Sequence, residues 1–541
     1  MISRRIHIVS LAVGLLSVIN CQVSTSQTLV YLERADNLLF DQEVASDAQI
    51  VIGNVLFRHD DALMYCDSAC FYEASNSLDA FGHVRLVQGD TLTGFGDKLF
   101  YNGNTKLARL RQNVRLIHHQ SVLTTDSLNY DRAKDLAYYY SGGKIVDDLN
   151  TLTSRWGQYT PYNKRAAFRD SVHLVNDRFT MDTDTLLYDT ESHIAQLVSP
   201  TVVLYEQETT ILSSNGLYNT RTEESELYDR SSVTHSDGMF LIGDTIFYDK
   251  IRSFGRLYGN IEIIDSTEQM TLRGDYGEMY ESGSEAAVHP EWGDYGFVTR
   301  RALLESWSDS LHTYVHADTL YTEELALSDT LPKDSTYRRI RAYRNARIYR
   351  EDMQAVCDSM VYLGNDSIGK MYGMPVCWSD NNQVSADSIY VYMKDEVVDY
   401  AHGMGNAICI QQHDLLHYNQ MSGKEIFAHV KDGDVYRVDV NGNAETVFFP
   451  LDEKDHSITG CNRTQSSFVK VFLENRQVHH VLFTTSTTGT MYPLEQASDA
   501  VMHLGAFFWA DDERPRVPAD VLVHVERTPR QGKKAVSATQ E

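Results

Sequence analysis

The sequence predicts an all-β protein in which antiparallel strands form a stacked array of repeats. Three observations support this prediction. A tyrosine-ended motif returns every 29 to 32 residues through the first half of the chain. Each copy is followed by a second segment with alternating apolar and polar residues. The 541 residues include only 10 prolines and as many as 32 tyrosines, a composition that suits strands.

The first half of each repeat reads Asp-x-Leu-x-Tyr. Its Asp, Leu and Tyr share one face, because side chains alternate along a strand. We expect the Leu to be buried, the Tyr to cover the rim with its hydroxyl in water, and the Asp to bond local amides near the strand start. The clearest copies are Asp36–Phe40, Asp97–Tyr101, Asp126–Tyr130, Asp184–Tyr188, Asp244–Tyr248 and Asp358–Tyr362.

The second half is a Gly/Asn step followed by a strand whose middle residue is often polar and whose neighbours are apolar. Copies include Gly53–Phe57, Gly82–Leu86, Gln112–Leu116, Gly259–Ile263 and Gly405–Ile410. One face of this strand is therefore apolar, and the other is exposed to solvent. The two halves together predict an inward apolar ladder of Val55, Phe57, Val84, Leu86, Leu99, Val114, Leu116, Leu128, Val172, Leu174, Leu186, Val202, Leu204, Ile246, Ile261 and Ile263. In a closed sandwich the same residues would simply be core.

Charge and motif content exclude several functions. The formal net charge of -27 argues against a nucleic-acid partner, because phosphate binding needs a basic surface. Glycine pairs such as Gly94–Gly96 lack the third glycine of a nucleotide loop. His413 and His417 would lie about 13 Å apart on a strand, too far to share a zinc ion. We therefore expect no cofactor, no metal and no catalytic residues, and hence no enzyme.

The N-terminus resembles an export signal. Arg4 and Arg5 precede an apolar run, and small residues lead to a cleavage position after Ser26. The alternative is an outer-membrane lipoprotein modified at Cys21. An exported protein is free to oxidise its other six cysteines. Cys377 and Cys409 occupy equivalent repeat positions on the polar face. They could pair if neighbouring repeats stack by one strand, and they cannot pair if two strand spacings separate them.

The repeats divide the chain into four segments. Residues 1–26 form the signal peptide and 27–290 form a regular array. After the break near Pro290, a less regular array follows over 291–491. Residues 492–541 are expected to hold one short helix near Ser498–Phe508 and a disordered tail.

Asp-x-Leu-x-Tyr followed by Gly-Asn-Val-x-Leu resembles the repeat of the OstA/LptA family, which is found in periplasmic lipopolysaccharide-transport proteins. About ten copies in register carry this resemblance, from Val30 to Tyr280 and more loosely to Met491. In its length the chain resembles the long OstA-like proteins of Bacteroidetes-type bacteria. The insertion near Pro290 and the C-terminal region depart from the usual pattern.

The resemblance implies a β-jellyroll, or β-taco, with an apolar interior. It implies a periplasmic protein that binds lipopolysaccharide or a lipid A-like glycolipid and carries or bridges it toward the outer membrane. It also implies partners with OstA-like domains, joined by edge-strand pairing. The alternatives are a non-enzymatic β-solenoid scaffold for envelope assembly and, less favoured, an envelope polysaccharide-acting enzyme.

Overall fold

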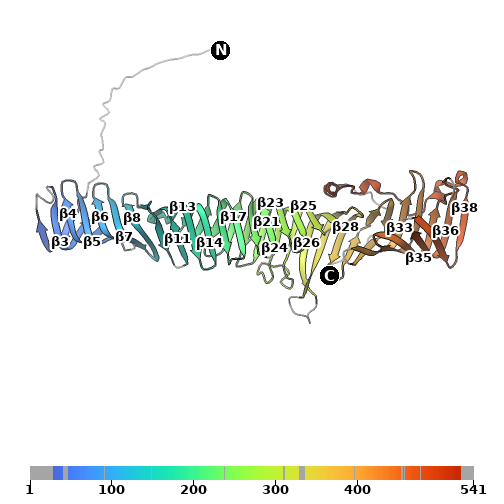
Figure 1. Cartoon of the computed structure of the whole chain (residues 1–541), viewed down its shortest axis with the longest axis horizontal. Helices are drawn as coiled ribbons and strands as arrows, with labels where there is room; N and C mark the ends of the chain where they lie inside the picture. The colour runs from blue at the N-terminus through green and yellow to red at the C-terminus, as the bar shows by residue number, and fades with distance from the viewer. Residues whose placement is uncertain are drawn as a thin grey trace, which may run out of the picture. The chain divides into compact units, whose positions relative to one another are not determined.

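The computed structural model describes residues 28–525, except 41–46, 91, 148, 237, 309–310, 328–334, 395–396, 453–454, 456 and 475–476. The expected signal peptide with Cys21 and the tail from 527 onward lie outside the described residues. Antiparallel strands make up nearly all of the rest (Figure 1), which confirms the all-β prediction. In this part of the chain, no helix is both long and apolar enough to cross a membrane.

Two compact units make up the chain. Unit 1 comprises Met1–Leu149 with Arg155–Asn163, and unit 2 comprises Asn150–Ser154 with Lys164–Glu541. The strands of unit 1 are β1 (Tyr31–Arg34), β2 (Asn37–Leu39), β3 (Gln49–His59), β4 (Ala62–Tyr72), β5 (Ser77–Gln88), β6 (Leu92–Asn102), β7 (Leu107–His118), β8 (Ser121–Asp131), β9 (Leu136–Tyr139), β10 (Gly143–Val146) and β12 (Trp156–Thr160), followed by the 3-10 turn η1 (Pro161–Asn163).

Unit 2 holds the remaining strands. Its first part contains β11 (Asn150–Ser154), β13 (Arg165–Asn176), β14 (Phe179–Asp189), β15 (Ile194–Leu197), β16 (Thr201–Tyr205), β17 (Thr209–Ser213), β18 (Asn215–Asn219), β19 (Glu224–Tyr228), β20 (Ser231–His235), β21 (Met239–Gly243), β22 (Thr245–Asp249), β23 (Phe254–Asp265), β24 (Met270–Tyr280), β25 (Tyr295–Trp307) and β26 (His312–Ala326). Its second part contains β27 (Thr336–Tyr349), β28 (Gln354–Leu363), β29 (Ile368–Tyr372), β30 (Val376–Ser379), β31 (Asn382–Ser385), β32 (Ser388–Lys394), β33 (Val397–Gln412), β34 (Tyr418–Lys431), β35 (Asp434–Phe448), β36 (Cys461–Glu474), β37 (Gln477–Thr484) and β38 (Thr488–Tyr492). Short helical segments follow: η2 (Leu494–Gln496), α1 (Asp499–Met502), η3 (Asp511–Glu513) and η4 (Pro518–Leu522).

All strands belong to one hydrogen-bonded sheet, and some long strands pair with different neighbours through their two halves. Within unit 1, β8 pairs with β10 through residues 122–125 and with β9 through residues 129–131. In unit 2, β14 likewise pairs with β16 through its first half and with β15 through its second half. The long strands therefore turn a corner near the middle, and their two halves enclose one apolar interior, as in a β-jellyroll.

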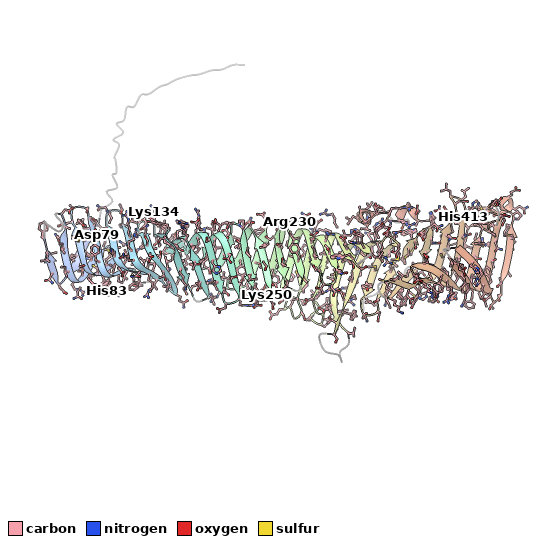
Figure 2. The ribbon with its side chains drawn as sticks, viewed as in Figure 1. Asp79, His83, Lys134, Arg230, Lys250 and His413 are labelled. Carbon is pink, nitrogen blue, oxygen red and sulfur yellow. The ribbon has the colours of Figure 1, made fainter. Side chains whose placement is uncertain are left out.

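A bulge with two left-handed residues forms many of the corners. In β5 these residues are Gly82 (φ 73°) and His83 (φ 40°), where the register with β4 shifts. The imidazole Nδ1 of His83 lies 2.7 Å from Oδ2 of Asp67 on β4, and the His83 side chain points out into solvent (Figure 2). Similar pairs recur in both units: Asn54 with Asp36, Asn113 with Asp97, Asn260 with Asp244, Asn345 with Asp318 and Asn406 with Asp387.

The motif aspartate lies opposite the Gly/Asn step of the following strand. Asp36 and Asp244 directly precede β2 and β22, as expected, whereas Asp97 lies in the middle of β6. Asp36 shows both of its contacts: its amide donates to the Gly53 carbonyl (2.9 Å), and its Oδ2 accepts from Asn54 (2.8 Å). The two half-motifs of the repeat are thus the two sides of one corner.

Substitution of Gly82 by alanine should destabilise unit 1 through this corner. A Cβ on Gly82 would lie 2.4 Å from Oδ2 of Asp67, whereas a Cβ on Gly89, which also has positive φ, would meet nothing within 4 Å. We expect Gly82→Ala to lose about 1–2 kcal/mol more stability than Gly89→Ala. Denaturant unfolding of the two variants measures this difference. Equal losses would show that the aspartate moves away at little cost.

Burial of the predicted ladder follows the alternation, with three exceptions. Thirteen of its 16 residues are at most 4% exposed, including Leu99 and Leu128, which are fully buried. Ile263 is only partly buried against the core. Val202 and Leu204 are 44% and 37% exposed, and their inward prediction is wrong.

The register of β16 explains this error. Val203, not its neighbours, pairs with the buried Met181 of β14 and is 3% exposed. The corner before β16 contains Ser199 and Pro200 in place of a Gly/Asn step, so the motif gave no marker for the register. A shift of one residue exchanges the two faces of a strand.

The break near Pro290 does not interrupt the hydrogen-bonded ladder. Residues 281–294 leave the array as a loop, and β24 still pairs with β25 on either side of it. Trp292 of this loop packs on an aromatic cluster that includes Tyr280 and Tyr295. The expected boundary at residue 290 is therefore a loop between paired strands.

Candidate functional site

Two rows of turns border the interior of the array. In unit 1, row A comprises the turns at 60–61, 89–90 and 119–120, and row B comprises those at 73–76, 103–106 and 132–135. Every long strand runs from one row to the other. Rows A and B are therefore the two free edges of the folded sheets, and we call the space between them the mouth.

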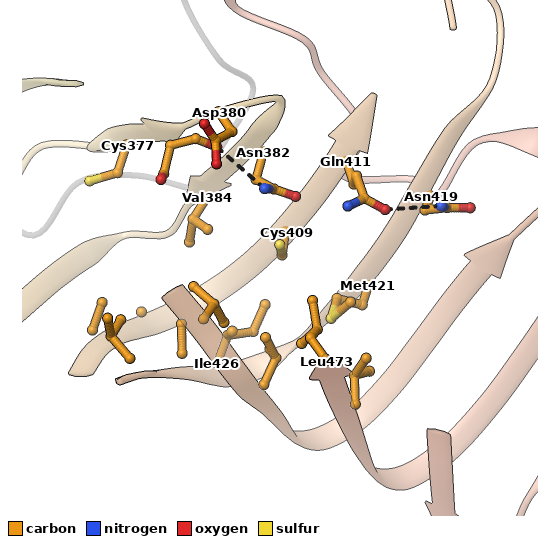
Figure 3. A pocket seen from close by; sticks show the side chains of 18 of the residues that line it. Cys377, Asp380, Asn382, Val384, Cys409, Gln411, Asn419, Met421, Ile426 and Leu473 are labelled. Atoms are coloured by element: carbon orange, nitrogen blue, oxygen red, sulfur yellow. Dashed lines mark hydrogen bonds between the residues drawn. The ribbon is translucent and has the colours of Figure 1, made fainter. Parts of the chain in front are cut away.

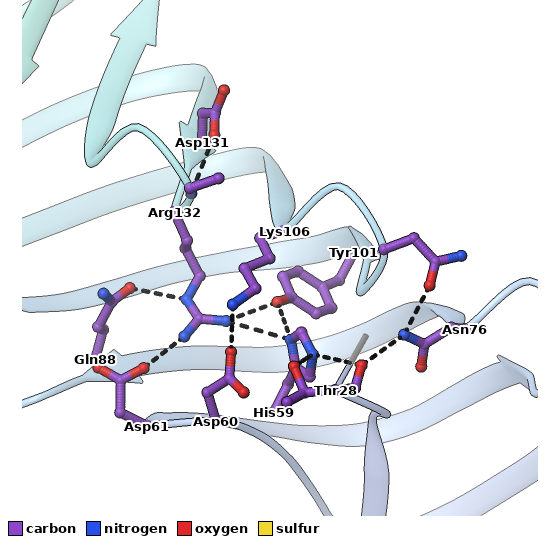
Figure 4. Close-up of polar contacts among 12 residues, drawn as sticks. Thr28, His59, Asp60, Asp61, Asn76, Gln88, Tyr101, Lys106, Asp131 and Arg132 are labelled. Atoms are coloured by element: carbon purple, nitrogen blue, oxygen red, sulfur yellow. Dashed lines mark hydrogen bonds and ion pairs between the residues drawn. The ribbon is translucent and has the colours of Figure 1, made fainter. Parts of the chain in front are cut away.

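Polar side chains close the mouth of unit 1 (Figure 4). From row B, Lys106 contacts Asp60 of row A at 2.7 Å, and Arg132 contacts Asp61 at 2.6 Å. Arg132 also donates to Oε1 of Gln88 (2.9 Å), and its side chain is only 3% exposed. The interior of this unit is thus sealed from solvent along these turns.

His59 and Tyr101 lie beneath these ion pairs. The His59 ring contacts the Tyr101 hydroxyl at 2.6 Å, and that hydroxyl accepts from Arg132 at 2.7 Å. Burial lowers the pKa of His59 and raises that of Tyr101, so both are neutral at pH 7. Tyr101 ends an Asp-x-Leu-x-Tyr copy, so its hydroxyl is buried where we had expected it in water. The reason is that the closed mouth makes the rim part of the interior.

Unit 2 also has two rows of turns, of which row A includes those at 177–178 and 380–381, and row B those at 220–223 and 432–433. Comparable contacts cross the mouth between these rows in the first part of unit 2. Arg178, from row A, lies 2.6 Å from Glu223 of row B, and the Tyr205 hydroxyl donates to the same glutamate at 3.1 Å. Further along, Arg338 next to row B contacts Asp265 next to row A at 3.2 Å. These bridging contacts all precede β28.

An apolar cavity of about 510 Å³ occupies the interior between β28 and β37 (Figure 3). This volume is in the range of small-molecule sites. Residues next to both rows line the cavity, among them Asn381 from row A and Gly433 from row B, so the cavity reaches the mouth. Most of the wall is aliphatic and includes Val384, Ile389, Ile426, Val438, Val471 and Leu473.

Small side chains explain why this part of the interior is not filled. The Gly-Asn-Val-x-Leu motif gives Val114 and Leu116 in unit 1, where both are buried in a packed core. The same positions in β33 hold Ala407 and Cys409. On the other half of the sheets, Ala401 of β33 pairs directly with Ala428 of β34, and both line the cavity. Interiors are otherwise close-packed, so smaller side chains leave space.

Cys377 and Cys409 lie in this cavity wall and not on the polar face, which corrects the prediction for both. Each pairs with Val384 of the intervening β31, so two strand spacings separate them. Both are free thiols. Burial raises the pKa of Cys409 to about 12 and raises that of Cys377 as well, so the thiols stay protonated and behave as small apolar groups.

A row of amide side chains borders the cavity near row A. Asn382 pairs with Gln411, which pairs in turn with Asn419, on adjacent strands. Asn419 donates to Oε1 of Gln411 at 3.2 Å, and its own Oδ1 accepts from the Phe449 amide at 2.9 Å. The cavity thus has apolar walls, and uncharged amide side chains form part of its polar border.

The segment that follows β38, residues 493–525, runs back along the outside of the sheet beside the cavity (Figure 1, red). We call it the strap. Two buried glutamines bind its backbone with both amide atoms. Gln420 donates to the Met502 carbonyl (2.7 Å) and accepts from the Leu504 amide (2.8 Å). Gln383 makes the same pair of contacts with Phe508 and Ala510, at 2.8 Å each.

A third glutamine and an apolar face complete the attachment of the strap. Arg514 donates to Oε1 of Gln354 at 2.8 Å. The strap covers Ile410 and also Ile408, which replaces the polar middle residue of the motif. The predicted helix near Ser498–Phe508 is present only as the four residues of α1, because the strap is mostly extended.

The structure separates the predicted ladder from the cavity. The ladder residues Leu99, Leu128 and Leu186 are fully buried in a closed interior. Ile389, two residues after the motif aspartate Asp387, is the equivalent of these leucines and lines the cavity. The predicted ladder and the cavity wall therefore use the same position within the repeat, but in different repeats. The signal that was missed is the change to Ala, Gly and Cys at the neighbouring inward positions.

Fold and cavity together define a repetitive β-jellyroll protein whose apolar interior is closed in one part and hollow in another. Residues 27–184 match the family model of the OstA-like proteins, which agrees with the resemblance that the repeats show. No curated protein matches the chain. The cavity, lined by residues from 350 to 483, lies outside the matched segment.

Proposed function

We propose that this protein is a periplasmic lipid carrier of the lipopolysaccharide-transport class, and that it holds acyl chains in the cavity between β28 and β37. The observation that carries the proposal is the hollow apolar interior of about 510 Å³ that reaches the mouth. Burial of one methylene group contributes about 0.8 kcal/mol, so a twelve-carbon chain gains up to roughly 10 kcal/mol before ordering costs.

The OstA-like match supports this class of protein, because the repeat of this chain resembles the repeat of the lipopolysaccharide-transport proteins. In this proposal the protein binds and releases its ligand without a chemical step. Partners would be a glycolipid of the lipopolysaccharide type and transport proteins with similar domains, joined through the terminal strands.

Photo-crosslinking in cells tests the proposal. We would place a photoreactive amino acid at Val384 or Leu473, which line the cavity, and as controls at Leu99 in the closed interior and Leu482 on the surface. We expect lipid adducts from the two cavity positions and not from the controls. Absence of adducts at Val384 and Leu473, or equal labelling at Leu482, would contradict the proposal. Mass spectrometry of the adducts identifies the lipid.

A further inference from the structure

We infer that the ligand of the cavity is an acyl lipid whose polar group next to the chains is uncharged and hydrogen-bonding, a hydroxyl or an amide, and not a phosphate. This inference rests on the proposed function and specifies its ligand. It depends on three features of the described wall: its charge, the amide row and its capacity.

The charges of the wall disfavour an anion. Among the described residues that line the cavity, Arg350 is the only basic one, and Asp352, Asp380 and Asp434 are acidic. Asp352 already accepts from Nε and Nη2 on one edge of the Arg350 guanidinium, at 2.6 and 2.9 Å. A phosphate at this border would therefore leave water and find more acidic than basic residues, and no uncommitted cation, among the described residues that line the cavity.

The amide row offers the complementary groups for a neutral polar ligand. Asn382 donates through Nδ2 to the Ser379 carbonyl (3.3 Å), which leaves its Oδ1 as an acceptor. Gln411 accepts through Oε1 from Asn419, which leaves its NH₂ group as a donor. Asn382 and Gln411 are direct neighbours on β31 and β33, and both border the apolar wall (Figure 3). The Gln411 donor and the Asn382 acceptor on these adjacent strands match a hydroxyl or an amide, because each of those groups can both donate and accept a hydrogen bond.

The volume limits how much lipid the cavity takes. A cavity of about 150 Å³ binds benzene, or about 25 Å³ for each carbon. At that ratio the 510 Å³ cavity holds about 20 carbons, which is one long chain or two short ones. A glycolipid with more chains would place only part of its acyl groups here.

Two lipids with the same acyl chain distinguish an uncharged polar group from a phosphate. We would measure binding of 1-palmitoylglycerol and of its 3-phosphate to the full-length protein by tryptophan fluorescence and by calorimetry. We expect the uncharged lipid to bind at least about tenfold more tightly than the phosphate. The double substitution Asn382→Leu and Gln411→Leu should lower the affinity for the uncharged lipid by about tenfold, because two hydrogen bonds are lost. Asn419 is kept, since it holds the Phe449 amide.

A charge variant provides the second measurement. Asp380→Asn with Asp434→Asn should reduce the preference for the uncharged lipid by several-fold. Equal binding of the two lipids by the wild type, or tighter binding of the phosphate, would overturn the inference and leave the proposed function standing. If neither lipid binds, and crosslinking from Leu473 also gives no adduct, the proposed function falls as well.

Discussion

Tryptophan at Ala428 will abolish lipid adducts from the cavity. The Ala428 side chain lines the cavity and pairs across the strands with Ala401, so an indole at this position occupies the space that the acyl chain needs. Displacement of even four methylene groups removes about 3 kcal/mol of burial, which is roughly a hundredfold in affinity. The measurement is the yield of adduct from Leu473 in the Ala428→Trp background.

Two control substitutions distinguish a filled cavity from a damaged protein. Ala74→Trp makes the same change at an exposed turn of unit 1 and should leave the adduct yield unchanged. Ala108→Trp inserts an indole into the closed, packed core, where it should destabilise the protein by about 1–3 kcal/mol or more. Ala428→Trp should be much better tolerated, because space for the ring already exists. Wild-type adduct yield in Ala428→Trp would show that the chains bind elsewhere.

The contrast between Ala108 and Ala428 also shows what the sequence could and could not predict. Alternation along each strand identified the inward face, and the period identified the repeat. Leu99 and Ile389 occupy the same position in that repeat, yet one is core and the other lines a cavity. The difference depends on the size of neighbours from other strands, and a pattern read along one strand does not contain it.

Contacts between residues that lie far apart in the sequence could not be predicted from the repeat pattern either. The motif aspartates show a strict spacing, but their role became clear only when the next strand was placed beside them, as with Asp67 and His83. Ile408 stands where Arg115 stands in unit 1, and this change from polar to apolar was a readable sign that something covers that face. The strap that covers it contacts Gln383 from 125 residues away, and no local pattern pairs such distant segments.

Replacement of Gln383 by leucine should release the middle of the strap. Gln383 is 1% exposed, and its amide bonds the Phe508 carbonyl and the Ala510 amide. Its Oε1 also accepts from Nε1 of Trp378 at 3.2 Å. The leucine leaves all three groups buried without these partners. Each such group costs about 1–3 kcal/mol, so the loss should exceed about 3 kcal/mol.

Hydrogen exchange measures this loss locally, since unit 2 is too large for a simple two-state unfolding analysis. In Gln383→Leu we expect the Ala510 amide to exchange at least about a hundredfold faster. The Leu504 amide, which Gln420 holds independently, should change less. Gln465→Leu, an exposed glutamine on β36, is the matched control and should alter neither amide. Unchanged exchange at Ala510 would mean that the apolar contacts of Phe508 and Leu504 hold the strap without the glutamine. A faster rate at both amides would instead mean that the strap opens as one cooperative segment, because the three glutamines then support each other along its whole length.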